Sequence, residues 1–129
     1  MNFIDDTHCL RFVELIEKSG KRCDRRVDGQ YAAAMSLLST ETIYPHAINH
    51  VSNDGIDFHA IKSRPLSEAG LYMAAVAENL FTGRGAVNLD NLMMLDSENF
   101  TTVLRALQFR KVGSGYEPEA DTEMELDSE

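Results

Sequence analysis

The chain has 129 residues, of which 43% are hydrophobic and 26% charged. This length and balance are typical of one globular domain that needs neither disulfides nor metal ions to fold. Cys9 and Cys23 lack the spacing of a zinc or redox motif, so we expect reduced thiols. No basic-then-apolar leader and no apolar stretch of about 20 residues is present, which excludes a membrane-spanning class and predicts a cytoplasmic protein.

The formal net charge of −9 is unevenly distributed. Residues 1–112 carry all 12 basic and 14 of the 21 acidic side chains, whereas residues 113–129 carry seven acidic side chains and no basic ones. We therefore predict a single helical domain over 1–112 and a disordered acidic tail over 113–129, because the tail has too few apolar groups to order itself. The acidic residues of the tail considered for interaction are Glu117, Glu119, Asp121, Glu123, Glu125 and Asp127.

Two helices are predicted in the first 40 residues. Asp5, Asp6 or Thr7 can cap a helix that runs to about Ser19, before Gly20. Its apolar positions at helical spacing are Leu10, Phe12, Val13 and Ile16. Asp28 can cap a second helix through Tyr31, Met35 and Leu38, in which three alanines raise helix propensity.

The middle of the chain is harder to assign. Pro45 either kinks a helix that begins near Thr40 or starts a separate short helix at its first turn. Residues 52–55 (Ser-Asn-Asp-Gly) have the composition of a turn. Residues 56–61 fit a short strand and a helical turn equally well.

The longest apolar run lies between Ser67, a favourable helix cap, and Gly83, a favourable helix stop. The nine residues 69–77 are apolar except for one tyrosine hydroxyl, which predicts a helix covered on most sides. Gly70, Ala74 and Ala77 form a smooth face that permits close approach of another backbone. We therefore predict that this helix, at about 67–82, is the buried centre of the fold.

Two further elements are predicted near the end of the domain. Asn88 caps a brief turn that carries Leu89, Leu92 and Met93, and Asp96 caps a last helix. That last helix shows an apolar stripe at i, i+3, i+4 and i+7, formed by Phe100, Val103, Leu104 and Leu107. The predicted fold is all-α, with four or five helices packed around the helix at 67–82.

Cations are concentrated at the end of the first helix and after it. They are Lys18, Lys21, Arg22, Arg25 and Arg26. One interpretation is a solvated helix end whose cations favour the negative end of the helix dipole. The other is an anion-binding patch, which the acidic tail can screen by pairing with it.

The strongest group of candidate metal ligands is His46, His50 and His59, with Asp54 and Asp57 nearby. His46 and His50 are four residues apart, so on a helix both rings face the same way, as two zinc ligands require. The segment between them offers no glutamate to act as a general base, unlike the zinc-protease pattern. Surface or core histidines are therefore the favoured interpretation.

Other catalytic patterns are missing from the sequence. The glycine-rich residues 82–85 follow a predicted helix, whereas a phosphate-binding loop precedes one. No nucleophile elbow or closely spaced carboxylate pair in an apolar setting is found. We expect no cofactor and no enzymatic activity.

Four segments, 31–39, 55–61, 79–83 and 100–110, resemble a family of short uncharacterised proteins of Firmicutes gut bacteria and their mobile elements. The resemblance spans about residues 28–111 and rests on hydrophobic patterns such as Asn79-Leu80-Phe81. It implies a small helical cytosolic protein that accompanies phage or conjugative genes. Small acidic proteins in that setting are sometimes inhibitors of host defence complexes, as anti-CRISPR proteins are, and no site residue follows from the resemblance.

The leading functional prediction is a non-enzymatic protein-binding module, with inhibition of a host nucleic-acid-handling or defence complex as its specific form. The second is a nucleic-acid-binding regulator that uses the basic run at 18–26 together with Arg105, Arg110 and Lys111. The third is a small metal-dependent enzyme that uses the segment from His46 to His59. No oligomeric state follows from the sequence.

Overall fold

The computed structural model describes residues 3–22 and 27–113, and it is all-α, as predicted. Four longer helices are accompanied by three short ones, a single 3-10 turn and a hairpin of two two-residue strands. Their bounds are α1 Asp6–Lys18, α2 Gly29–Leu38, α3 Tyr44–Ala47, η1 Ile48–His50, β1 Val51–Ser52, β2 Gly55–Ile56, α4 Phe58–Lys62, α5 Glu68–Thr82, α6 Leu89–Met93 and α7 Ser97–Val112. The described part therefore has more helices than the four or five predicted, because the connections fold into single turns.

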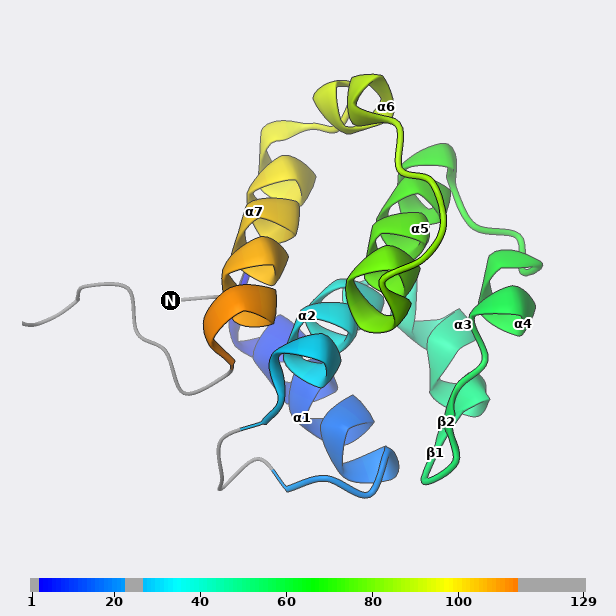
Figure 1. Ribbon diagram of the computed structural model, residues 1–129, viewed down its shortest axis with the longest axis vertical. Coiled ribbons are helices and arrows are strands. Elements are labelled where there is room, and N and C mark those ends of the chain that lie inside the picture. Colours follow the sequence, from blue (N-terminus) through cyan, green and yellow to red (C-terminus); the bar gives the residue numbers. More distant parts are fainter. Residues whose placement is uncertain (1–2, 23–26, 114–129) are drawn as a thin grey trace, which may run out of the picture.

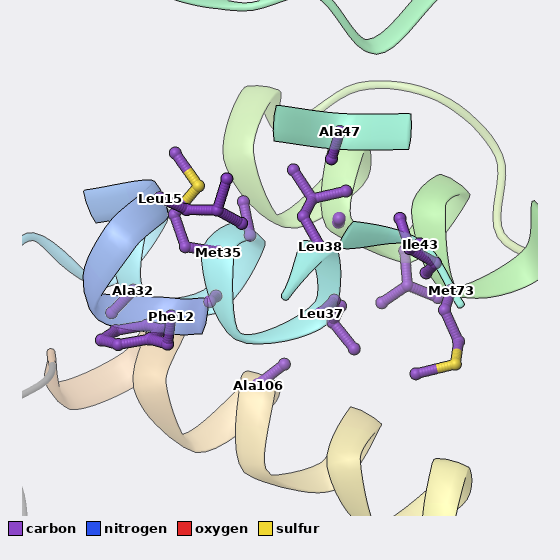
Figure 2. Close-up of a cluster of buried hydrophobic side chains, with 14 of the residues drawn as sticks. Phe12, Leu15, Ala32, Met35, Leu37, Leu38, Ile43, Ala47, Met73 and Ala106 are labelled. Atoms are coloured by element: carbon purple, nitrogen blue, oxygen red, sulfur yellow. The ribbon is translucent and has the colours of Figure 1, made fainter. Parts of the chain in front are cut away.

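The central helix is α2, not the helix at 67–82. Every residue of α2 from 32 to 38 is buried, and the helix packs against α1, α5 and α7 (Figure 1). Figure 2 shows side chains of α2, such as Met35 and Leu37, among those contributed by the helices around it. The prediction of the centre was wrong because α2 has small residues at three successive positions. These let neighbouring helices approach on all sides, which a count of apolar residues does not reveal.

Helix α5 has the predicted ends but only one buried side. The side chain of Ser67 accepts a hydrogen bond from the Gly70 N–H at 3.0 Å, and Gly83 ends the helix with a φ of 75°. Gly70, Ala74 and Ala77 are buried, as the smooth face predicted. Leu71 on another side is 38% exposed, so α5 lies at the edge of the core.

Helix α1 also begins where the sequence predicted. The side chain of Asp5 accepts a hydrogen bond from the His8 N–H at 2.8 Å, and the helix ends before Ser19. Leu10 was predicted to face the core, but it is 68% exposed. The buried residues are His8, Phe12, Leu15 and Ile16.

In the segment from 40 to 62, the structure decides the two assignments that the sequence left open, namely the role of Pro45 and the secondary structure of residues 56–61. Pro45 lies in the first turn of the separate short helix α3, and Tyr44 beside it donates a hydrogen bond to Glu14 of α1. Burial, and then the bond to Glu14 and its charge, raise the pKa of Tyr44 to about 12. The predicted turn joins β1 to β2, whose register pairs Val51 with Ile56. Residues 56–61 contain both alternatives, since Ile56 ends β2 and α4 begins directly after Asp57.

Helices α2 and α7 are in close contact where α2 begins. A Cβ atom on Gly29 would lie 2.3 Å from the carbonyl oxygen of Arg110 and 2.8 Å from that of Phe109. The positive start of α2 thus meets the last carbonyl groups of α7, an arrangement that the helix dipoles favour. Figure 1 shows these two ends side by side at the lower part of the molecule. Within the described residues, no helix is long and apolar enough to cross a membrane.

Candidate interaction surfaces

Helix α7 carries an apolar stripe on its outer side. The sequence predicted that Phe100, Val103, Leu104 and Leu107 face the core, but the buried residues of α7 are Thr102, Val103, Ala106 and Phe109. Leu104 is 44% exposed and Leu107 is 46% exposed. The buried face is thus turned away from the most apolar one, because small Ala106 permits the close approach to α2.

Helix α6, the element before α7 in the chain, also carries exposed apolar side chains. Leu92 is its buried anchor at 8% exposure, whereas Leu89 is 68%, Met93 63% and Met94 76% exposed. The helix starts with an Asn88 side chain that accepts a hydrogen bond from the Asp90 N–H at 2.9 Å. Figure 1 shows α6 bridging the ends of α5 and α7.

Five of the seven exposed large hydrophobic residues in the described part of the chain lie on α6, on the residue after it, or on α7. We call them the α6–α7 apolar surface: Leu89, Met93, Met94, Leu104 and Leu107. Such a concentration on two consecutive elements is typical of an interaction site, whereas single exposed residues such as Leu10 are ordinary.

A second surface is charged and gathers residues from distant parts of the chain. Lys21 Nζ lies 4.7 Å from the centre of the Tyr31 ring, and that ring meets the edge of Phe81 at 4.9 Å. Arg110 Nε donates to the carbonyl oxygen of Leu80 at 2.9 Å. The segment after α1, the end of α5 and the end of α7 thus meet near the start of α2, and each of these three segments carries cations. We call this the basic pole, formed by Lys21, Arg22, Arg84, Arg110 and Lys111.

The structure therefore groups the cations differently from the sequence prediction. Lys18 donates to the carbonyl oxygen of Ile48, so it ties α1 to η1. Arg105 does not join the other two cations of α7, since it lines a hollow of about 310 Å³ together with Phe3 and Ile4. Arg25 and Arg26 lie outside the described residues, as does Cys23. The predicted acidic sites also lie outside them: Glu117, Glu119, Asp121, Glu123, Glu125 and Asp127.

The structure distributes the three candidate metal ligands over different elements. His46 is in α3, His50 ends η1, and His59 is in the first turn of α4. The Asp57 side chain accepts the Ala60 N–H at 3.0 Å as a helix cap. In residues 3–22 and 27–113, no group of three or more His, Cys, Asp or Glu side chains is placed to hold a metal ion. The hollow of about 350 Å³ beside the hairpin includes His50, but neither His46 nor His59.

The glycine-rich residues after α5 form a helix stop rather than a phosphate cradle. The Asn79 side chain donates to the carbonyl oxygens of Arg84 and Gly85, at 3.0 and 2.8 Å. The Arg84 N–H donates to the Thr82 hydroxyl at 3.0 Å. These bonds fold the loop back on the end of α5, so its backbone does not converge at a helix start.

His8 is a structurally important residue that the sequence analysis missed. It is 1% exposed, and its two ring nitrogens lie 3.0 Å from the Ile4 backbone N and 2.8 Å from the Ser36 carbonyl oxygen. Burial lowers its pKa, although the bond to Ser36 acts in the opposite direction. No local motif marks it, since its partner on α2 is distant in sequence.

Comparison with known proteins provides no further assignment. No family model, no curated protein and no solved structure matches the chain.

Proposed function

We propose that this protein is a non-enzymatic binding module whose α6–α7 apolar surface docks a partner protein. The observation that carries the proposal is the exposure of Leu104 and Leu107 on the helix face that has the strongest apolar pattern. Covering a fully exposed Leu or Met side chain is worth about 1.5–3 kcal/mol. The five side chains of this surface are 44–76% exposed, so covering each of them is worth about half to three quarters of that value.

The residue that continues the apolar stripe of α7 indicates which chemical groups a partner must present. Lys111 lies four positions after Leu107, so it extends the same helix face, and it is exposed. A complementary partner presents an apolar ridge with a carboxylate at one end, which pairs with this ammonium group. The specific form of the proposal is a cytoplasmic inhibitor of a nucleic-acid-handling or defence complex, and its support is the sequence resemblance described above.

The test replaces both exposed leucines of α7 with glutamate (Leu104→Glu together with Leu107→Glu). A partner captured from the bacterial host is purified, and its Kd is measured for the wild type, this variant and Leu10→Glu. Leu10 is a matched control because it is an exposed leucine on α1. Two central interface residues at about 2 kcal/mol each predict at least a 100-fold weaker Kd for the double variant and little change for the control.

Two results would contradict the proposal. An unchanged Kd in a double variant with native helical circular dichroism would show that the partner binds elsewhere. Self-association of the purified wild type by sedimentation, abolished in the double variant, would show that a second copy occupies the surface.

Binding of a polyanion is the second candidate function, and the basic pole favours it. Its support is that Lys21 packs on Tyr31, which contacts Phe81, while Arg110 bonds to the neighbouring Leu80, so both cations lie at the contact of α2 with the end of α5. A gel shift on mixed DNA and RNA at low salt should show retardation that weakens in Arg84→Gln with Lys111→Gln. Arg64→Gln, a substitution of an exposed arginine between α4 and α5, is the control. Absence of retardation for the wild type would exclude this candidate.

A further inference from the structure

Helix α7 has an opposite charge at each end of its outer apolar stripe. Asp96, which caps the helix, and Lys111, in its last turn, are both exposed. Between them lie Leu104 and Leu107, at 44% and 46% exposure, and the partly exposed Phe100. At about 100° per residue, these five positions fall within about 80° of one another around the helix axis. The stripe therefore runs from a carboxylate through three apolar side chains to an ammonium group.

The other charges of α7 lie beside this stripe or on the far side of the helix. Glu98 and Arg105 line the hollow of about 310 Å³ on the opposite side. Arg110 is next to Lys111, and its Nε donates to the carbonyl oxygen of Leu80 on α5 at 2.9 Å. The C-terminal end of the stripe is therefore purely cationic among the described residues of α7.

The spacing of the stripe matches that of a second helix. Phe100, Leu104 and Leu107 follow one another at intervals of four and three residues, which is about one helical turn, or roughly 5.4 Å. Apolar residues of a partner helix recur at the same interval and can pack between them as ridges pack into grooves. Binding of an amphipathic helix through such anchors is a recurrent mode of recognition. From Asp96 to Lys111 the stripe is roughly 22 Å long, so about four turns of a partner helix cover it.

The charged ends of the stripe select the direction of such a helix. In an isolated helix, acidic residues are favourable in the first turn and basic residues in the last. A partner antiparallel to α7 places its first turn opposite Lys111 and its last turn opposite Asp96, so the same charges also pair with α7. A parallel partner needs a cation in its first turn and a carboxylate in its last, which opposes its own dipole. The dipoles of two antiparallel helices also attract each other.

We propose that the partner segment docked on α7 is an amphipathic helix that runs antiparallel to α7. It has a carboxylate in its first turn opposite Lys111 and a cation in its last turn opposite Asp96. This inference rests on the proposed function, since it specifies the partner of the α6–α7 apolar surface. The leucines supply most of the affinity and the two charges set the direction, because exposed ion pairs are individually weak.

The test uses two fluorescent peptides of identical composition as probes. Each repeats the intervals of the α7 stripe in reverse order, with a charge at the first residue, leucines four, seven and eleven residues later, and the opposite charge at the last residue. A hydrocarbon staple on the far face keeps both helical, and blocked termini remove the end charges. The matched peptide starts with glutamate and ends with arginine, and the reversed peptide exchanges them. At low salt the full chain should bind the matched peptide about tenfold more tightly by fluorescence anisotropy.

Two variants separate direction from docking. Asp96→Asn with Lys111→Gln removes both charges and retains a helix cap, since the Asp96 side chain accepts the Asn99 N–H at 3.3 Å and asparagine caps equally well. This variant should bind both peptides with equal Kd, whereas Leu104→Glu with Leu107→Glu should lose both. A tenfold preference that persists in the charge variant would overturn the proposal, because it would belong to the peptides alone.

The wild type can also contradict the proposal. Equal Kd values for the two peptides would overturn the direction, and binding of neither would overturn the helix. The proposed function fails by a separate result, namely an unchanged Kd of the natural partner in the leucine variant. Self-association of the wild type by sedimentation, lost in Asp96→Asn with Lys111→Gln, would show that α7 of a second copy occupies the stripe, which also contradicts the proposal.

A nitroxide label on the matched peptide measures the direction itself. On the first residue of the peptide, the label should broaden amide resonances of residues 110–112. On the last residue, it should broaden those of 96–98. The reverse pattern would mean that the helix runs parallel to α7 and would overturn the proposal.

Discussion

His8 of α1 donates a hydrogen bond from Nε2 to the carbonyl oxygen of Ser36, 2.8 Å away near the end of α2. The direction of this bond is fixed because the Ile4 N–H donates to Nδ1 of the same ring at 3.0 Å, so a neutral ring carries its proton on Nε2. One turn later, Arg11 Nε donates to the carbonyl oxygen of Ser39 at 2.6 Å. Side chains of α1 thus satisfy carbonyl groups that the end of α2 leaves without helical partners.

The neutral state of His8 predicts a pH-dependent stability. Burial lowers its pKa in the folded protein below the ordinary value of 6.5, and protonation would remove the acceptor that Ile4 requires. Below pH 6.5 the unfolded chain therefore binds more protons than the folded chain, and the free energy of unfolding decreases as the pH falls. Its slope approaches about 1.4 kcal/mol per pH unit per proton. Urea unfolding between pH 7.5 and 5 measures the decrease.

The matched variant is His8→Gln, which retains a donor for Ser36 but does not titrate. It should be less stable at pH 7.5 and should lack most of the decrease between pH 6.5 and 5. His46, His50 and His59 remain in this variant, so a decrease equal to that of the wild type would assign the effect to other groups.

Gly29→Ala should destabilise the fold even though alanine has the higher helix propensity. The added methyl group would lie 2.3 Å from the Arg110 carbonyl oxygen, and this neighbour is backbone that cannot rotate away. We expect a loss of about 1–3 kcal/mol in the free energy of unfolding, the usual cost of overpacking. Gly70→Ala is the control, because its nearest neighbour is the Ser67 hydroxyl at 3.2 Å. Equal melting temperatures of the two variants would contradict the close approach of α2 and α7.

Ala74→Leu tests the buried face of α5. Ala74 is 0% exposed, so the larger side chain should reduce the free energy of unfolding by about 1–3 kcal/mol. Ala75→Leu is the matched control, since Ala75 borders a hollow of about 150 Å³ beside Tyr72 and Val87 and has room for added atoms. Chemical denaturation of both variants measures the difference, and a smaller loss for Ala74→Leu than for its control would show that the face is not packed.

The rotation of α7 is tested by two adjacent truncations. Val103 is 2% exposed, so Val103→Ala removes buried methyl groups and should cost about 2 kcal/mol. Leu104→Ala removes a larger group, but at 44% exposure it should change the free energy of unfolding by less than about 1 kcal/mol. Urea unfolding of both variants measures the two losses. A larger loss for Leu104→Ala than for Val103→Ala would show that the predicted apolar stripe does face the core.

Helix ends were predictable because capping is local. Asp5, Ser67 and Asp96 each accept a backbone N–H three residues later, and Gly83 takes its positive φ directly after Thr82. Such signals depend on fewer than five neighbouring residues, so they can be read without knowledge of the fold. The pattern of residues 52–55 likewise contains the turn of the hairpin that the structure shows.

Which face of each helix is buried could not be predicted from neighbouring residues in the sequence. On α7 the sequence favours Phe100, Leu104 and Leu107, but close packing against α2 requires small Ala106 at the contact. For the same reason α2 and not α5 is central, since alanines allow neighbouring helices on every side. The extent of burial therefore depends on which helices meet.

By itself the sequence determined the all-α class, the helix ends and the separation of charge between the domain and residues 113–129. Only the tertiary structure decided which helix is enclosed, which leucines remain exposed, and which cations share one end of the molecule. The contact of His8 with Ser36 and that of Lys21 with Tyr31 belong to the second group. The physical reason is range: a cap or turn is fixed by neighbours in the chain, whereas burial and charge clustering are fixed by neighbours in space.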